Sequence, residues 1–169
     1  MTEKPGIPGR SETVLDSSAL RLLFLAPVCS LVVVTVLYLF LVPHMPEHVA
    51  RHVGPDGVGY SSTPVVFTLI CSAAAIAFAI GASTARGFMK AGHWYQKEKS
   101  IAVAILSLGY GVVGIALATL VSIAGTRADP LSGDSMGTSM LAFLFFFIGA
   151  AWIQTVALPR GKMEELNGS

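Results

Sequence analysis

Four long stretches of this 169-residue chain contain no Asp, Glu, Lys or Arg, and each has a strongly apolar centre. Each stretch is long enough for the roughly 20 helical residues that cross a bilayer core about 30 Å thick. Lipid offers no hydrogen-bond partner to the backbone, so a spanning segment of this length satisfies its peptide groups as a helix. The sequence therefore predicts an all-α, integral membrane four-helix bundle. Its expected spans are residues 22–42, 64–85, 100–124 and 136–158.

The composition supports a lipid environment. Only 12% of the residues are charged, against about 25% in a typical soluble domain. Hydrophobic residues make up 53% of the chain, and the mean hydropathy is +0.69. The formal net charge of +1 implies no bulk electrostatic partner, so we expect the lipid bilayer as partner and no nucleic acid. These values argue against an ordinary soluble enzyme and a disordered tail protein.

The distribution of Lys and Arg predicts the orientation. Nine of the eleven lie before the first expected span, between the second and third, or after the fourth, and only Arg51 and Arg127 lie on the other side. Positive residues favour the cytoplasm, so we expect an N-in/C-in, multi-pass protein of the cell membrane. Residues 1–19 and 160–169 mix Pro, Gly, Ser and both charge signs, which is typical of flexible cytoplasmic tails around a transmembrane domain at 20–159.

The expected inner loop, residues 86–99, carries four Lys or Arg and one Glu. Such a loop determines topology, and it can also contact anionic lipid headgroups. We expect Trp94 in this loop and Trp152 in the fourth span to lie at the inner membrane boundary, where amphipathic rings are enriched.

Small residues recur at helical spacing in two of the spans. The second span has the row Ala73, Ala77, Gly81 and Ala85, and the third has Ser107 with Gly111, then Gly114, Ala118 and Ser122. Helices associate in lipid by close backbone approach, which requires such residues. We expect the two faces to pack on each other or on a second copy. The residues of a homo-oligomer interface would be Ala73, Ala77, Gly81, Gly111, Gly114 and Ala118.

The fourth span carries four phenylalanines whose rings surround most of the helix. This pattern predicts a helix largely exposed to lipid. The residues are Phe143, Phe145, Phe146 and Phe147.

The loop after the first span holds three of the four histidines. Pro46 can open a short helix and Gly54 can close it, which would place His48 and His52 on one face at i and i+4. Two imidazoles at that spacing can share a divalent metal, with His44 as a third ligand if the chain turns back. A pH-sensing role and a structural role are the alternatives. Glu47 precedes His48, so this is not the zinc-protease motif H-E-x-x-H.

A tight turn is expected at Pro55-Asp56-Gly57, with Gly57 and Gly59 supplying positive φ where it is needed. Together these features make the loop the candidate site. Its ligand-binding or structural residues would be Pro46, His52, Gly54, Asp56 and Gly57.

The order Met45-Pro46, His52, Gly54 and Gly57 resembles a known signature. Domain-of-unknown-function family 1648 typically has LP-x-x-(V/I)-A-x-H-W-G-x-x-G-x-x-D-G-(Y/F)-x-S just after its first membrane helix. Val53 replaces the usual aromatic residue, and the linker at Val58 is shorter and lacks the usual Asp. The resemblance covers about 18 residues and the flanking helices.

The resemblance implies a small multi-pass membrane protein of the kind found mostly in bacteria. Some members of that family are halves of immunity or signalling proteins that protect a cell from a secreted peptide toxin. A role in protection or signalling is therefore suggested for this chain.

The sequence shows no nucleophile–base pair, no H-E-x-x-H and no phosphate cradle, so we expect a non-enzymatic protein that senses or binds a ligand at its outer loop. The alternatives are an oligomeric transporter or channel subunit and a metal-binding membrane protein. A membrane enzyme would have only the histidine loop for its chemistry. The residues name neither a ligand nor a cofactor.

Overall fold

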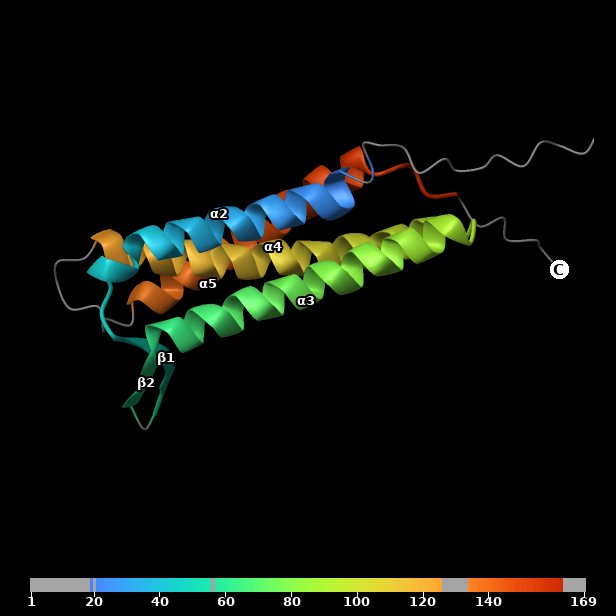
Figure 1. The fold of residues 1–169 in the computed structure, drawn as a ribbon. Coiled ribbons are helices and arrows are strands. Elements are labelled where there is room, and N and C mark those ends of the chain that lie inside the picture. The colour runs from blue at the N-terminus through green and yellow to red at the C-terminus, as the bar shows by residue number, and fades with distance from the viewer. Residues whose placement is uncertain (1–18, 20, 56, 126–133, 163–169) are drawn as a thin grey trace, which may run out of the picture.

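The computed structural model describes residues 19, 21–55, 57–125 and 134–162, and in these residues the chain forms four long helices and one β-hairpin (Figure 1). The predicted tails lie almost entirely outside the described residues. A π-helical turn, η1 (Arg21–Leu25), leads into α2 (Ala26–Leu41), which ends in the 3-10 turn η2 (Val42–His44). The hairpin strands follow, and then the other three helices. These elements are β1 (His48–Gly54), β2 (Gly57–Ser62), α3 (Thr63–Lys90), α4 (Gln96–Gly125) and α5 (Asp134–Ala157).

The all-α class and the four apolar helices predicted from the charge-free stretches are confirmed. By length and composition, four helices among the described residues are able to cross a membrane: Arg21–His44, Thr63–Lys90, Gln96–Ser122 and Gly137–Ala157. The π-helical turn ends immediately before the helix that contains Pro27. Proline lacks a backbone N–H, and the interrupted hydrogen-bond ladder accounts for the widened turn at this point.

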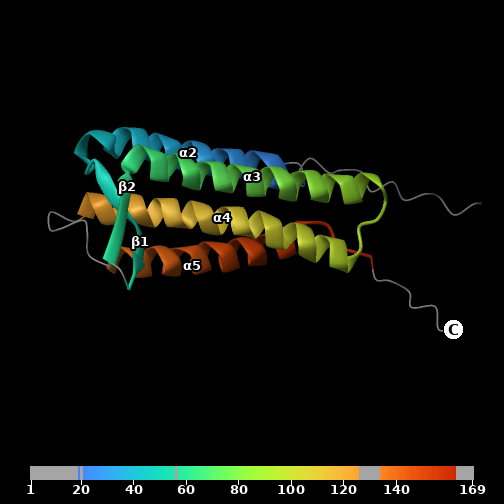
Figure 2. The ribbon, with the colours of Figure 1, turned by 90° about the horizontal axis from the view of Figure 1, so that it is seen from below.

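Helix α4 is the centre of the bundle. It contacts α2 and α3 on one side and α5 on the other, as two perpendicular views show (Figures 1 and 2). In the most apolar window of each helix, 56% of the α4 residues are buried, against 11% in α2 and 6% in α5. The other helices therefore pack around α4, and their outer surfaces stay largely apolar and exposed.

Glycines of α4 let aromatic rings of its neighbours approach the backbone. A Cβ added to Gly109 would lie 2.6 Å from the Phe78 ring of α3, and one added to Gly111 would lie 2.7 Å from the Phe143 ring of α5. At Gly114 the added atom would lie 2.8 Å from the carbonyl oxygen of Ala142. Gly111 and Gly114 thus face α5, so at these two residues neither of the expected partners, the second span or a second copy, is the one that the structure shows.

The small-residue row of α3 is confirmed in part. Ala77, Gly81 and Ala85 are buried, and Gly81 faces Leu106 of α4 at a distance that excludes a side chain. Ala73, in contrast, is exposed. Five of the six residues expected at a homo-oligomer interface, including Ala118, are therefore buried within one chain. Self-association stays a prediction.

The phenylalanines of α5 divide between two environments. Phe145 is 75% exposed, as expected for a ring facing lipid. Phe143 and Phe146 are half-buried because they occupy the space left by Gly111 and Gly114. The helix as a whole is largely exposed, as predicted, although two of the four rings pack against α4; contact of the exposed surface with lipid stays a prediction.

At the end of the bundle away from the hairpin, Lys99 and Trp94 join the start of α4 to the end of α5. Lys99 is 5% exposed, and its Nζ donates hydrogen bonds to the carbonyl oxygens of Thr155 (2.8 Å) and Leu158 (3.0 Å). A cation at this position satisfies the unpaired carbonyls of a helix C-terminus and complements its dipole. The buried Trp94 donates from Nε1 to the carbonyl oxygen of Pro159 at 3.0 Å. The Trp94 ring is therefore packed inside the protein at this end of the bundle, and its position relative to a membrane boundary stays a prediction.

The close contact at Gly114 predicts a destabilised variant. Gly114→Ala places a methyl group against a backbone carbonyl that has no freedom to rotate away, so we expect a loss of about 1–3 kcal/mol in the free energy of unfolding. Gly149→Ala in α5 is the matched control, because no atom lies within 4 Å of the added methyl group. Denaturation in mixed micelles, followed by circular dichroism, measures both. Equal stability of the two variants would contradict this packing.

Candidate functional site

The histidine-rich segment forms a β-hairpin, and the short helix predicted over it is wrong. Backbone pairing runs from His48 with Ser62 to Gly54 with Gly57 in antiparallel register. The segment is rich in the β-branched residue valine, which favours strands, and it is too short for a helix to form without strong packing. The outer hairpin, residues 48–62, projects from the bundle at the end where α3 begins (Figure 1).

The turn of the outer hairpin agrees with the sequence. Gly54 pairs with Gly57, so Pro55 and Asp56 connect the two strands. Gly57 has φ +109°, a conformation that L side chains rarely adopt. The tight turn with a positive φ at Gly57 is therefore confirmed. Asp56 itself, a predicted ligand-binding residue, lies outside the described residues.

A β-bulge interrupts β1. The pairs Ala50 with Tyr60 and His52 with Gly59 leave Arg51 as an extra residue on this strand. A bulge twists a strand and disrupts the local pairing, and it re-aims the side chains around it. The backbone position of His52 thus follows directly after the irregularity.

Two of the three predicted metal ligands, His44 and His48, have described side chains. His44 ends the η2 turn and His48 begins β1, and both are exposed. On a strand, a step of four residues such as 48 to 52 covers about 13 Å, whereas helical neighbours at this spacing lie about 5–6 Å apart. Among the described residues, no group of three His, Cys, Asp or Glu is able to hold a metal ion. The helical i and i+4 spacing that suggested a shared metal is therefore absent, and a metal site at these histidines stays a prediction.

The base of the outer hairpin is held firmly to the helices. The buried Thr63, first residue of α3, donates from Oγ1 to the Pro46 carbonyl oxygen at 2.6 Å. Its backbone N–H also donates to the Glu47 carbonyl oxygen at 2.9 Å. Val49 is buried, and the rings of Tyr38 and Phe67 stack with centroids 3.9 Å apart beneath it. Pro46 thus acts through its carbonyl as an attachment point of the hairpin.

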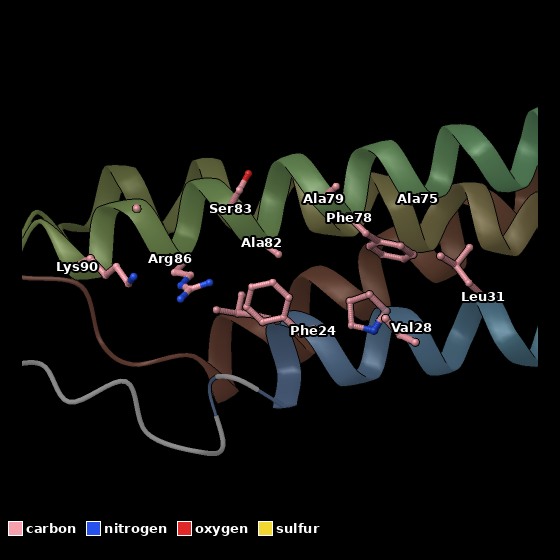
Figure 3. A pocket seen from close by; sticks show the side chains of 13 residues that line it. Phe24, Val28, Leu31, Ala75, Phe78, Ala79, Ala82, Ser83, Arg86 and Lys90 are labelled. Carbon is pink, nitrogen blue, oxygen red and sulfur yellow. The ribbon is translucent and has the colours of Figure 1, made fainter.

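A second candidate site is a groove of about 710 Å³ between α2 and α3, at the opposite end of the bundle. We call it the α2/α3 groove. Its apolar walls include Phe24, Val28 and Leu31 on one side and small residues of α3 on the other (Figure 3). Arg86 and Lys90 lie at its end. No pattern in the sequence predicts this groove, because its existence depends on the distance between α2 and α3.

Comparison with known proteins yields no match for this chain among protein-family models, curated proteins or solved structures. The resemblance of residues 45–57 to domain-of-unknown-function family 1648 therefore stays a prediction. The geometry of the outer hairpin and of the α2/α3 groove is therefore the basis for a proposed function.

The Thr63 anchor predicts how the outer hairpin responds to substitution. Thr63→Val removes the hydroxyl but keeps the shape, so the hairpin base loses a part-buried hydrogen bond that contributes about 1 kcal/mol. We expect amide exchange in residues 48–62 to become about fivefold faster, measured by hydrogen–deuterium exchange. Thr63→Ser keeps the donor and serves as the control. Unchanged exchange in Thr63→Val would show that the contact does not hold the hairpin.

Proposed function

We propose that this protein is a non-enzymatic, multi-pass protein of the cell membrane that binds an extracytoplasmic peptide ligand at its outer hairpin. Both termini lie in the cytoplasm in this proposal. The single observation that carries the binding role is a two-stranded hairpin, in the described part of the chain, that is anchored at its base and projects sideways from the bundle beside the start of α3.

The exposed surface of the helices supports a position in a bilayer. Large apolar side chains that are more than half exposed cover α2 and α5, among them Leu39, Phe40, Phe145 and Val156. A soluble monomer rarely exposes an apolar surface of this extent, whereas lipid is a suitable solvent for it. The four apolar helices are long enough to span the core.

The two ends of the bundle differ in a way that supports the proposed orientation. Arg86, Lys90, Lys97 and Arg160 are exposed at the end opposite the outer hairpin. Positive residues flanking membrane helices favour the cytoplasmic side. The hairpin, at the other end, would therefore face outward.

The form of the outer hairpin indicates how it would bind. In the described residues each strand has one neighbour, so each has a second edge with unpaired backbone groups. Such an edge accepts an extended peptide as an additional strand, with main-chain hydrogen bonds supplying the affinity. An isolated two-stranded hairpin is marginally stable, and a third strand would add pairing that the hairpin lacks. The resemblance to a family with members that protect against peptide toxins suggests the same class of ligand.

Labelling of single cysteines tests the proposed orientation. Cys29 and Cys71 are free thiols, so Cys29→Ala and Cys71→Ala provide a background without other targets. We expect a membrane-impermeant maleimide to label His48→Cys in intact cells and to label Ala91→Cys only after permeabilisation, because both positions are exposed at opposite ends of the bundle. The reverse pattern would contradict the orientation and, with it, an outward-facing hairpin.

Displayed ten-residue peptides, selected on the full-length protein in nanodiscs, test the binding role. We expect the affinity of a selected peptide to fall about two- to tenfold when an amide that faces the hairpin is N-methylated, because each such change removes one main-chain hydrogen bond. N-methylation at the intervening positions is the control and should have no effect, since alternate amides of a strand point to opposite sides. Failure to recover peptides, or binding without this alternation, would contradict the proposal.

A further inference from the structure

We propose that the α2/α3 groove binds one anionic phospholipid of the cytoplasmic leaflet, with an acyl chain along its apolar walls and the phosphate at Arg86 and Lys90. This inference rests on the proposed function, because it requires the helices to lie in a bilayer with the basic end inside. It names a second ligand class and a site separate from the outer hairpin.

The groove arises from uneven packing of α2. This helix makes most of its interhelical contacts with α4 and fewer with α3, which the preceding η1 turn also contacts. The α3 wall is lined by the small residues Ala75, Ala79 and Ala82, which do not reach across the space to Val28 and Leu31 (Figure 3). Val28 and Ala79 are exposed, so the groove is open at the side of the bundle and a lipid chain has access to it. Its volume of about 710 Å³ is typical of a small-molecule site.

The length of the apolar part matches one leaflet. Ala75 and Ser83 are eight residues apart on α3, which corresponds to about 12 Å along the helix axis. Half of a hydrocarbon core about 30 Å thick is about 15 Å. An acyl chain lying in the groove would therefore run from the headgroup level to near the bilayer centre.

The charge at the end of the groove matches a phosphate. Arg86 and Lys90 are one helical turn apart on α3 and share a face. Figure 3 shows the Arg86 guanidinium directed toward the space beside Phe24. No described residue that lines the groove is acidic, and neither cation forms an ion pair with a described residue. Basic pockets between membrane helices on the cytoplasmic side bind anionic headgroups in this way.

Site-specific quenching in nanodiscs tests the inference. A bimane fluorophore on Val28→Cys, in the Cys29→Ala/Cys71→Ala background, reports from the groove wall, and one on Val156→Cys reports from an exposed position of α5 near the same end. Phosphatidylglycerol and phosphatidylcholine, each carrying a nitroxide on the acyl chain, are the quenchers at equal mole fraction. We expect phosphatidylglycerol to quench the groove reporter more strongly than phosphatidylcholine, and the two lipids to quench the α5 reporter equally.

Two pairs of variants test whether the charge and the shape of the groove cause a preference for phosphatidylglycerol. Arg86→Gln with Lys90→Gln should lower the preference for phosphatidylglycerol at the groove reporter by about fivefold for each cation removed. Lys97→Gln with Arg160→Gln removes the same charge from exposed positions outside the groove and should leave the preference unchanged. Ala79→Leu fills the groove and should reduce quenching by both lipids, whereas Ala73→Leu, exposed outside it, should not.

Each contrary result has a distinct meaning. Equal quenching of the groove reporter by the two lipids would overturn recognition of an anionic headgroup. A groove reporter shielded from both lipids, beside an α5 reporter that is quenched, would show another occupant and also overturn the inference. Deletion of residues 1–18 or a change in the number of copies per disc would then identify that occupant. Absence of quenching at both reporters would show that the helices do not enter the bilayer, which overturns the proposed function itself.

Discussion

The close approach of neighbouring side chains to the backbone of α4 determines the rest of this structure. In lipid, helices gain little from burying apolar surface against each other, so stable association requires extensive van der Waals contact. Gly109, Gly111 and Gly114 provide it by leaving room for the rings of Phe78, Phe143 and Phe146. Because these glycines face α3 on one side and α5 on the other, a single helix holds both neighbours, and their outer surfaces remain available to the surroundings.

Different contacts hold the two ends of the bundle. At one end Thr63 attaches the base of the outer hairpin to the start of α3 through the carbonyl groups of Pro46 and Glu47. At the other end Lys99 and Trp94 bind the carbonyl groups that the end of α5 leaves unpaired. The hairpin can therefore project sideways from the bundle without loosening the helices, since its base is fixed and the far end of the bundle is held independently.

The sequence predicted the elements that local patterns determine and missed those that depend on contacts between distant segments. The charge-free stretches predicted the four apolar helices, and Pro55-Asp56-Gly57 predicted the turn. Both predictions depend on length, hydropathy and backbone freedom, which are local properties of the chain. The helix expected around His48 is wrong. The i and i+4 spacing of two histidines does not show whether the segment instead pairs as a strand with residues 57–62. Lys99 looked like a loop cation, and only the fold brings the carbonyls of Thr155 and Leu158, more than 50 residues away, to its ammonium group. The α2/α3 groove could not be predicted from the sequence, because it depends on the distance between two packed helices and not on a local pattern of residues.

Helix α2 connects the two candidate sites. At its C-terminal end it continues through η2 into the outer hairpin, and at its N-terminal end Phe24 of η1 and Val28 form a wall of the α2/α3 groove. Few of its side chains are buried, namely Pro27 and Val34 together with Leu23 of η1. Elements with few buried contacts have low local stability and respond first to a change in their surroundings. Both candidate sites thus adjoin the α2 segment on one side and α3 on the other, and Phe78 of α3, which lines the groove, also packs against Gly109 of α4.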